Sequence, residues 1–372
     1  MSRKRILILR PDNIGDVLLF TGALQHIRNL YPTAHITFAV QPHIVNLIEL
    51  CPFVDSCISI DDLTWWGKIK NPIIRRLHIG EQIIRKSNQL FNIFHHTFDI
   101  VIYPVKSQHV PYLKIAQDLR AKKIYGITGC NVNAPRNGFP KDLQPKRILS
   151  DYLDVSGDDP WKHELITTLD FLRLLGCRIS SVAELQPQLW LSASDNNFLI
   201  WAKEQDAKII GLFPGASFSF KCWNPKNYFT LTKLIGGKVI YVLLGSAADK
   251  DFTDQAELEI RKVCGEAGIV NLVGKTTLRE LAKNISSCDL LIGMDTSGLH
   301  IAIASGIPTI GIVSGAHYKR FFPWGDSDKH IILTEMMDCF HCNWICPKGD
   351  FACIQKVTPV TVANAAKKLL KM

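Results

Sequence analysis

The sequence predicts an α/β protein of the doubly wound class, with two Rossmann-like domains that are each built on a parallel sheet. One observation is that short apolar runs rich in leucine and β-branched residues alternate with segments of helical apolar spacing. Another is that a stretch rich in Asn, Pro, Gly and Asp, residues 130–160, interrupts this alternation, which begins again near residue 208. The third is the length, because 372 residues are many for one domain and comfortable for two.

In the first half, continuous apolar runs predict strands at 4–9, 35–40, 56–60, 98–104 and 123–127. Helical spacing of apolar residues predicts helices at 17–30, 45–50, 69–77, 81–94 and 165–175. The stretch 130–160 is predicted to be loop, because Pro, Gly, Asn and Asp favour turns. Strands that alternate with helices in this way form parallel sheets with helices on both faces.

In the second half, strands are expected at 208–213, 239–244, 269–272, 290–293 and 309–313. Helices are expected around 195–204, 226–234, 253–267 and 278–285, with a short one after Asp295. The predicted organisation is a first domain at 1–185 and a second at 186–350. A cysteine-rich loop at 339–353 and a final helix within 354–372 complete the chain.

The composition is that of a globular protein, with 47% hydrophobic and 21% charged residues and a formal net charge of +9. This balance suggests an anionic partner, although an ordinary solvated surface accounts for it equally well. The basic residues are dispersed and no nucleic-acid-binding motif is present, so no nucleic acid is expected as a partner. The basic N-terminus lacks the apolar region of a signal peptide, and no apolar run approaches the roughly 18 residues of a membrane span. We therefore expect a cytoplasmic protein whose eleven cysteines are mostly reduced thiols.

The first candidate site is the turn RPDNIGDVL, which follows the first strand and opens the first helix. Ligands of open α/β sheets bind at the carboxyl ends of the strands, so Asn13, Gly15 and Asp16 should face a crevice. Asp16 is either a general base or only a carboxylate that stabilises the first turn of the helix. The dinucleotide fingerprint GxGxxG is absent here.

The second candidate site is the turn Asp295-Thr296-Ser297-Gly298, between a predicted strand and a short helix that carries His300. A helix N-terminus offers unpaired N–H groups to an anion such as phosphate. Asp295 or Thr296 can cap the helix, and Gly298 lets a ligand approach the backbone. An ordinary capped turn is the alternative.

Two further glycine turns follow strands of the second half. Gly215 and Ser217 can supply backbone and hydroxyl donors to a phosphate, and Lys221 can supply a positive charge for a diphosphate. Gly245 begins a turn that either holds a nucleoside or merely connects a strand to a helix.

Four cysteines, Cys339, Cys342, Cys346 and Cys353, lie within fifteen residues of one another. In a cytosolic chain this density favours tetrahedral thiolate coordination of a structural zinc or iron ion. A redox-sensitive disulfide pair and simple local packing are the alternatives.

Together these segments resemble glycosyltransferase family nine, the ADP-heptose:lipopolysaccharide heptosyltransferases. The resemblance covers nearly the whole chain and is carried by the order and spacing of several segments. They are ILILRPDNIGDVLLFTGAL, FPGASFSFKCWNPKNYF, LLGSAADKDF and NLVGKTTLRELAKNISSCDLLIGMDTSGLHIAIASGIPTIGIVSG. The segment CFHCNWICPKGDFACIQKVTP looks like one found in heptosyltransferase II-type members.

The resemblance implies a GT-B fold, in which two Rossmann-like domains face a central cleft and a final helix packs back toward the N-terminal domain. It implies that the N-terminal domain binds the acceptor and the C-terminal domain the nucleotide sugar. The implied reaction inverts the anomeric centre and needs no catalytic metal. ADP-heptose or another nucleotide sugar is the implied donor, and a lipid A–core molecule at the inner-membrane surface is the implied acceptor.

The resemblance also implies roles for particular residues. Asp16 is the general base, with Asn13 and Gly15 on the acceptor side, and Lys221 stabilises the leaving diphosphate. The donor-binding set is Gly215, Ser217, Lys221, Gly245, Asp295, Thr296, Ser297, Gly298 and His300. The chain departs from the family pattern at Ser297, where a glycine is usual, and at Ala248, where many members carry an acidic residue.

Basic residues near two tryptophans are candidates for contact with the anionic membrane surface, with a buried pair and solvated charges as the alternative. They are Trp65, Trp66, Lys68, Lys70, Arg75, Arg76 and Lys86. Two other functions stay open from the sequence. One is a related transferase with a different nucleotide sugar or a protein acceptor, and the other is a non-enzymatic anion-binding protein with a metal loop.

Overall fold

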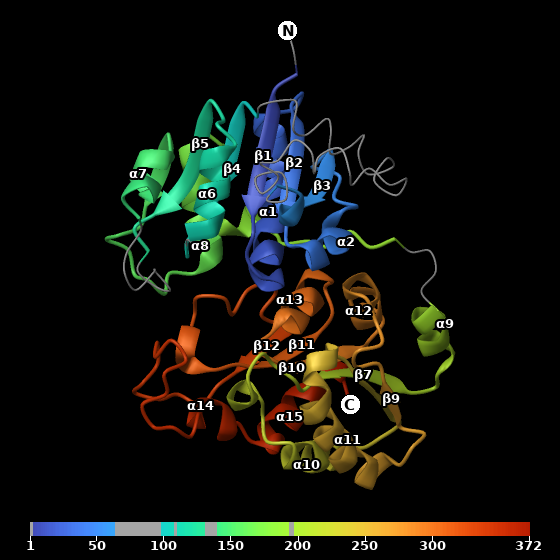
Figure 1. Cartoon of the computed structure of the whole chain (residues 1–372). Coiled ribbons are helices and arrows are strands. Elements are labelled where there is room, and N and C mark those ends of the chain that lie inside the picture. The colour runs from blue at the N-terminus through green and yellow to red at the C-terminus, as the bar shows by residue number, and fades with distance from the viewer. Residues whose placement is uncertain (1–2, 64–97, 108–109, 131–139, 193–196) are drawn as a thin grey trace, which may run out of the picture. The chain divides into compact units, whose positions relative to one another are not determined.

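A computed structural model describes residues 3–63, 98–107, 110–130, 140–192 and 197–372 (Figure 1). The chain divides into two compact units, Met1–Leu185 and Gln186–Met372. Each unit contains one parallel sheet, which confirms the predicted fold class.

The sheet of the first unit has the strand order β3-β2-β1-β4-β5-β6 among the described residues. Its strands are β1 Arg5–Arg10, β2 His35–Val40, β3 Ser56–Ser59, β4 Ile100–Tyr103, β5 Lys123–Thr128 and β6 Asp151–Asp154. The central strand β1 is apolar and buried from Ile6 to Leu9, since helices cover both faces of a parallel sheet.

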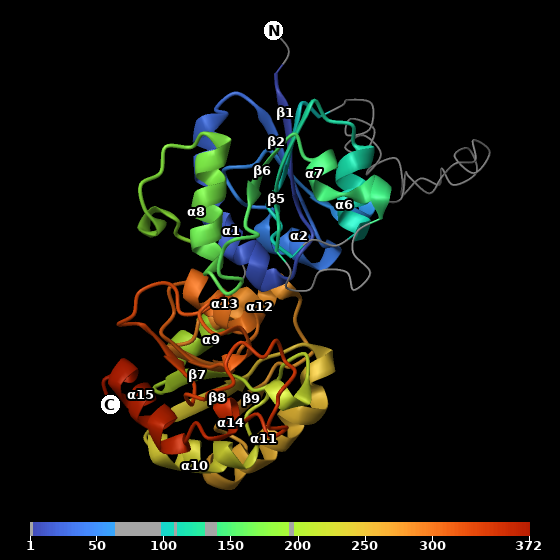
Figure 2. The same ribbon diagram turned by 90° about the vertical axis from the view of Figure 1, so that its left-hand side faces the viewer.

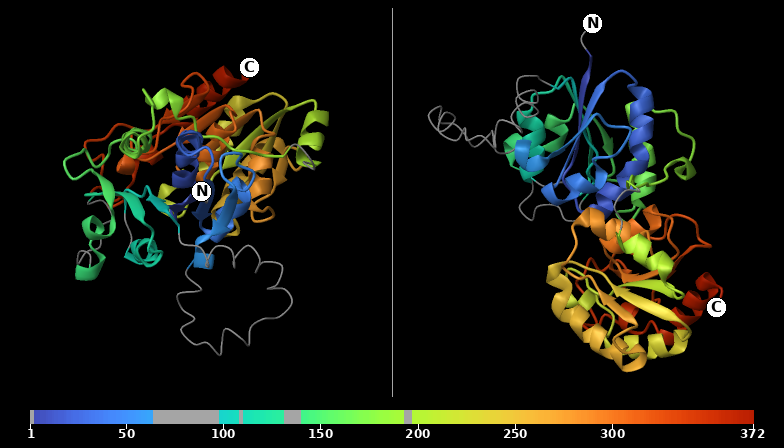
Figure 3. Two further views of the ribbon diagram at one scale, coloured as in Figure 1. Left: turned by 90° about the horizontal axis from the view of Figure 1, so that it is seen from above. Right: turned by 90° about the vertical axis from the view of Figure 1, so that its right-hand side faces the viewer.

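Among its described residues, the first unit has helices α1 Ile14–Leu30, α2 Val45–Ile48, α6 Val110–Asp118, α7 Pro145–Ile148 and α8 Glu164–Leu175. Helices α1 and α8 pack side by side on one face of the sheet, and α6 and α7 lie on the other (Figure 2). The right-hand view of Figure 3 shows the same sheet between its helices. This doubly wound arrangement places the loop between β1 and α1 at the carboxyl edge of the central strand.

The sheet of the second unit has the order β12-β11-β10-β7-β8-β9 among the described residues. Its strands are β7 Lys208–Phe213, β8 Val239–Leu243, β9 Ile269–Asn271, β10 Leu290–Met294, β11 Thr309–Ile312 and β12 His330–Leu333. Its helices are α9 Asn197–Glu204, α10 Lys226–Ile235, α11 Lys250–Cys264, α12 Leu278–Ile285, α13 Ser297–Ala304, α14 Ala352–Gln355 and α15 Pro359–Leu370. Strands β10, β7 and β8 are neighbours, so the loops that follow them share one edge of the sheet.

The C-terminal segment belongs to the core of the second unit. Helix α15 packs against α10, β10 and β11, and it buries Val362 and Ala366 completely. The indole Nε1 of Trp223, itself fully buried, donates to the carbonyl of Val357 at 2.8 Å. The amide of Gln355 donates to the carbonyl of Cys222, also at 2.8 Å. These bonds fasten the end of the chain to the loop that follows β7, whereas a return of the last helix toward the first unit stays a prediction.

The loop predicted at 130–160 is wrong in part, because α7 and β6 lie within it. Strand β6 reads DYLD and is partly exposed, and among the described residues it pairs with β5 alone. Its polar sequence therefore carries no strand signal. Strand β12 and helix α6 were also not predicted. The helices expected at 69–77 and 81–94 lie outside the described residues. No helix that the structure describes is long and apolar enough to cross a membrane.

Candidate functional site

A buried arginine organises the loop between β1 and α1. Arg10 is only 3% exposed, and its Nε lies 3.0 Å from the carboxylate of Asp12. Its Nη2 donates to the carbonyl of Asp16 at 3.4 Å, and its guanidinium lies over the ring of Phe20 with 5.2 Å to the centroid. The side-chain amide of Gln41 donates to the carbonyl of Pro11 at 2.7 Å. The loop is therefore held from several sides, which pre-organises the entry to α1.

Asp16 lies in the first turn of α1, as the sequence predicts. The N-cap position belongs to Asn13, which makes no side-chain capping bond, and Gly15 lies between the two. Asp16 is partly accessible to solvent, whereas Val17 and the residues that follow it are buried. The structure thus brings the predicted base Asp16 and the predicted acceptor-side residues Asn13 and Gly15 to the entry of α1 at the carboxyl edge of β1, and their roles stay predictions.

In the second unit, the turn after β7 lies against the turn after β8. A Cβ atom built on Gly215 would lie 2.5 Å from Cβ and Oδ1 of Asp249. The Asp249 carboxylate accepts hydrogen bonds from the backbone amide of Ser246 at 2.8 Å and from its hydroxyl at 2.7 Å. Asp249 was not singled out in the sequence, and the signal that points to it is the S-x-x-D capping box that starts at Ser246.

Lys221 and Asp295 influence each other in the second unit. Lys221 ends the short 3₁₀ helix Ser219–Lys221 and is partly buried. Burial lowers the pKa of Lys221, and the charge of Asp295 opposes this shift. Burial also raises the pKa of Asp295 to about 6, and the charge of Lys221 opposes that shift. Two residues that the sequence analysis assigns to the donor from distant segments therefore lie close enough for their charges to interact.

Aromatic rings surround the Lys221 ammonium. Its Nζ lies 3.5 Å from the ring centroid of Trp344 and 5.6 Å from that of Phe218, in cation–π geometry. Trp344 belongs to the cysteine-rich loop, so this loop reaches the candidate donor site. No local sequence pattern predicts this contact, because it joins segments more than a hundred residues apart.

Helix α13 begins at Ser297, with Thr296 at its N-cap position. Neither Thr296 nor Asp295 makes the predicted side-chain capping bond within the described structure. The Thr296 hydroxyl oxygen is buried and has no hydrogen-bond partner among the described residues. A buried polar atom of this kind is costly unless a ligand or water satisfies it, which favours a binding role for this turn.

The structure shows why position 298 is a glycine, a reason that the sequence does not reveal. A Cβ atom there would lie 2.5 Å from Cδ2 of the Phe213 ring, so only glycine lets α13 pack this closely on the end of β7. His300 is 5% exposed and lies between two aromatic rings, with 4.3 Å to Phe322 and 5.8 Å to Trp324 between ring centroids. Its Nδ1 accepts a hydrogen bond from the indole of Trp324 at 3.2 Å. Reach of His300 to a ligand stays a prediction.

A cavity of about 380 Å³ opens beside Asp295. It lies at the carboxyl ends of β11 and β12 and at the start of α15. Its polar lining includes Asp295, His317, Lys319, Thr334, Glu335, Lys356 and Thr358. The volume is within the range of pockets that bind small molecules.

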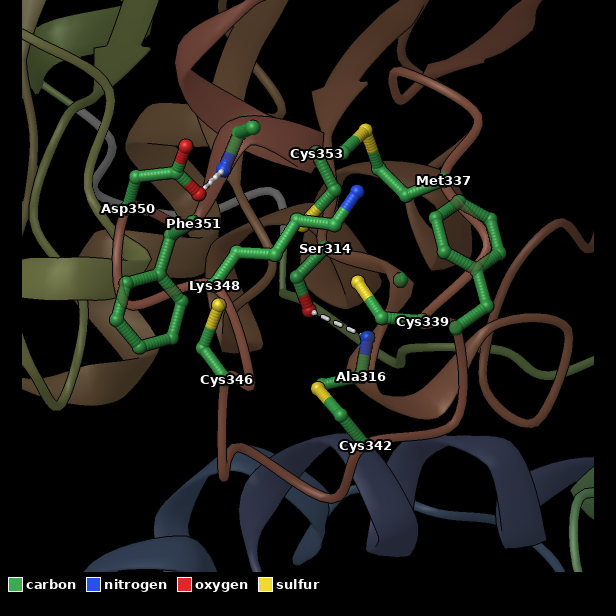
Figure 4. A pocket seen from close by; sticks show the side chains of 13 residues that line it. Ser314, Ala316, Met337, Cys339, Cys342, Cys346, Lys348, Asp350, Phe351 and Cys353 are labelled. Atoms are coloured by element: carbon green, nitrogen blue, oxygen red, sulfur yellow. Dashed lines mark hydrogen bonds between the residues drawn. The ribbon is translucent and has the colours of Figure 1, made fainter.

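The cysteine-rich loop forms a second, much smaller cavity, which all four cysteines line together with Ser314 and Lys348 (Figure 4). All eleven cysteines are free thiols. In the part of the chain that the structure describes, no group of three or more His, Cys, Asp or Glu side chains is already arranged to hold a metal ion.

Comparisons with known proteins show that the chain is similar to heptosyltransferases. It is 31% identical over 170 residues to lipooligosaccharide heptosyltransferase 2 of Campylobacter jejuni, an alignment that covers 44% of this chain and 51% of that protein. The chain thus spans about half the length of this relative. It is 24% identical over 333 residues to lipopolysaccharide core heptosyltransferase OpsX of Haemophilus influenzae, covering 89% of this chain and 85% of that protein.

The fold has solved counterparts. The structure of ADP-heptose lps heptosyltransferase II of E. coli superimposes with a TM-score of 0.67 at 19% identity, covering 99% of this chain and 98% of that one. The model of glycosyltransferase family 9 (heptosyltransferase) matches residues 135–347, which is more than half of the chain. The match includes the turns that carry Gly215, Lys221 and Asp295. The chain therefore belongs to glycosyltransferase family 9.

Proposed function

We propose that this protein transfers a heptose from ADP-heptose to an inner-core acceptor of lipopolysaccharide or lipooligosaccharide. The family match over residues 135–347 carries this proposal, and the heptosyltransferase relatives support it. The mutual electrostatic influence of Lys221 and Asp295 and the buried Thr296 hydroxyl, which has no partner among the described residues, support the proposal that the second unit binds the donor.

In the proposed reaction, the acceptor hydroxyl attacks the anomeric carbon of the heptose from the face opposite the diphosphate. A bond forms from the acceptor oxygen to this carbon, the bond from the carbon to the diphosphate breaks, and the configuration inverts. Asp16 takes the hydroxyl proton, and ADP leaves with the electron pair. General base catalysis of this kind typically contributes about 100-fold to 10,000-fold to a rate. The rigid loop that Arg10 holds supports this role, because a base must be fixed near its proton.

Charge on the leaving diphosphate is stabilised from the second unit. Lys221 supplies a positive charge, and the N–H groups at the start of α13 supply hydrogen bonds and the positive end of a helix dipole. Gly215, Ser217 and Gly245 lie in the neighbouring turns and are proposed to contact the donor. Because these groups stabilise the leaving diphosphate, the proposed reaction needs no catalytic metal.

The test uses purified full-length protein with ADP-heptose and a core-lipid acceptor that lacks the heptose. We expect a heptosylated lipid and ADP in equal amounts, at a rate that a chelator added during the assay leaves unchanged. Release of ADP without heptosylated lipid, or no reaction with any core acceptor, would contradict the proposal.

A different nucleotide sugar is the second candidate, and one feature favours it. Ser297 occupies a position where the family usually has glycine, and its side chain adds bulk at the start of α13. A bound ligand raises apparent stability, so thermal unfolding with ADP-heptose and competing nucleotide sugars separates the two. We expect the largest shift with ADP-heptose, and a larger shift with another sugar nucleotide would favour the second candidate.

We propose that the protein binds its acceptor at the cytoplasmic face of the inner membrane. The basic residues and tryptophans assigned to this contact lie between residues 65 and 86, outside the described residues. Sedimentation with liposomes that contain or lack acidic lipid tests it. We expect binding only with acidic lipid, weakened by salt because exposed charges are screened.

A further inference from the structure

Aromatic rings from two distant segments of the chain form one cluster beside Lys221. Phe218 and Phe220 precede it in the segment after β7, and Trp344 and Phe351 come from the cysteine-rich loop. The Phe218 and Phe220 rings stack with 5.1 Å between centroids, and Phe220 stacks on Phe351 at 4.5 Å. Trp344 lies tilted against Phe220 at 6.4 Å. Two rings of this continuous cluster, those of Trp344 and Phe218, face the Lys221 ammonium.

The Lys221 ammonium lies against aromatic faces rather than against an anion. Its Nζ is 3.5 Å from the centroid of the Trp344 ring, well inside the roughly 6 Å over which cation–π attraction acts. The Phe218 ring is farther away, at 5.6 Å. The charge of Asp295 acts on Lys221 from a longer distance, and within the described residues the ammonium forms neither a salt bridge nor a hydrogen bond. Trp344 is therefore its closest cation–π partner.

Backbone hydrogen bonds hold the loop that carries Trp344. The amide of His341 donates to the carbonyl of Gly315 at 2.8 Å, and the amide of Asn343 donates to the carbonyl of Ala316 at 3.3 Å. These bonds attach the start of the loop to the segment that follows β11. The backbone next to Trp344 is thus fixed by contacts in which Lys221 takes no part.

The Trp344 ring also has a partner of its own on the segment after β11. The His317 ring lies 5.3 Å from it between centroids, and Nε2 of His317 is 2.7 Å from Oδ1 of Asn343. Trp344 has a φ angle of 66°, which a bulky residue keeps only where the surrounding structure fixes it. The fold therefore determines where the indole lies, and the indole in turn gives the ammonium a fixed place.

An aromatic face is a suitable holder for a lysine that must bind phosphate. A carboxylate in contact with the ammonium would compete with the phosphate for its N–H donors, whereas a ring attracts the charge without such oxygen atoms. An ammonium has three N–H donors, so a ring on one side leaves the other sides open to phosphate oxygens. A lysine that is already in place also loses less side-chain entropy when the ligand binds.

We propose, on the basis of the proposed function, that Trp344 is a positioning residue of the donor site. Its ring holds the Lys221 ammonium in place without a carboxylate in contact, so that the N–H donors are available to the diphosphate of a nucleotide sugar. Trp344 acts through Lys221 and does not contact the reacting atoms.

The test measures ADP binding to full-length protein by isothermal titration calorimetry. We expect Trp344→Leu to weaken ADP binding about fivefold to thirtyfold, the range of a partly desolvated cation–π contact. Trp344→Phe keeps a smaller aromatic face and should lose less than Trp344→Leu. Ile345→Ala changes a side chain of the same loop that is 80% exposed, and it is the matched control that should bind ADP like the wild type.

A double-mutant cycle separates positioning from general damage to the site. If the ring acts through Lys221, Trp344→Leu should weaken ADP binding by less than about twofold when Lys221→Ala is already present. A loss of the same size in both backgrounds would overturn the proposal, as would wild-type ADP affinity in folded Trp344→Leu. If thermal unfolding shows that Trp344→Leu does not fold, Trp344→Phe takes its place in the cycle, with the same criteria.

This readout is independent of sugar transfer. Inorganic pyrophosphate is the second probe, because it carries the diphosphate without a nucleoside or a sugar. Binding of either probe that depends on Trp344, with no transfer to core lipid, would contradict the proposed function and leave the role of Trp344 standing. Transfer by the wild type with ADP binding that does not depend on Trp344 would overturn the role of Trp344 alone. Wild-type protein that binds neither probe would overturn it as well.

Discussion

Lys221 and Asp295 illustrate how burial sets the chemistry of individual residues. Burial lowers the pKa of the lysine and raises that of the aspartate to about 6, and each charge opposes the shift of the other. Burial therefore disfavours the charged form of both side chains, and the opposite charge of each compensates only in part. Residues with pKa values shifted by burial and a nearby charge are typical of ligand-binding sites. In the proposed function the ligand is the donor diphosphate.

Asp295→Asn should alter how stability depends on pH. In the wild type the folded pKa of about 6 lies above the ordinary 3.8, so the folded state holds its proton while the unfolded state loses it. The stability from this group is present below about pH 4 and is lost as pH rises to about 6 and above. The variant has no titrating group at this position and does not lose this stability. Its free energy of unfolding, relative to that of the wild type, should therefore rise by about 2 kcal/mol from pH 4 to pH 7.

Thermal and urea unfolding of both proteins at several pH values measure this difference. Asp251→Asn, an exposed change on α11, controls for the loss of a carboxylate. A difference between Asp295→Asn and the wild type that does not change with pH would contradict the raised pKa.

Lys221→Ala should weaken donor binding and slow transfer together, because the charge acts on the diphosphate both before and during bond breaking. Loss of one preorganised electrostatic contact typically costs about 100-fold in kcat. Steady-state kinetics and donor titration measure the two effects. Lys226→Ala, an exposed lysine nearby in sequence, is the matched control and should leave both unchanged. Equal kinetics for both variants would remove Lys221 from the site.

Sequence and structure agree on single residues where a motif is local. Strand–turn–helix patterns in the sequence correctly place Asp16 on the first turn of α1. Such patterns also place Thr296 and Ser297 at the start of α13. Asp249 and Trp344 were missed, because their importance lies in contacts with Gly215 and Lys221 that only the tertiary fold creates.

At the scale of elements, the close approach of α13 to β7 depends on Gly298. A side chain there meets the Phe213 ring at 2.5 Å. Gly298→Ala should therefore destabilise the protein by about 1 to 3 kcal/mol, as overpacking does. Thermal unfolding measures it, with Gly157→Ala as the control, because no atom lies within 4 Å of a Cβ built there. Equal melting temperatures for the two variants would show that α13 can move away without cost.

The sequence predicts those elements whose own residues carry the signal. Buried central strands such as β1, β7 and β10 are continuous apolar runs and were predicted within a residue or two. Strand β6 was missed because an edge strand needs only one neighbour and can be polar. Helix α11 begins three residues before its predicted start, at the Ser246–Asp249 capping box, whose local bonds extend it toward the N-terminus.

At the scale of the whole molecule, the alternation of strands and helices was enough to predict two doubly wound units. The prediction succeeds because two parallel strands need a crossover connection, which is usually a helix. The order of strands and helices along the chain therefore indicates a parallel sheet. The composition of residues 130–160 is a poorer guide to secondary structure. Its Asn, Pro, Gly and Asp residues predict loop, although α7 and β6 lie within this stretch. The clustering of four cysteines is visible in the sequence as spacing, whereas the contact of their loop with Lys221 through Trp344 is not.

The central claim is that the whole chain is a heptosyltransferase in which Asp16 is the base. The most direct test compares transfer from ADP-heptose to core lipid by the wild type and by Asp16→Asn, with donor affinity measured on both. We predict that the variant turns over at least about 100-fold more slowly while its donor affinity stays within about twofold, because only the proton transfer is lost. Near-normal turnover by the folded variant would contradict the account.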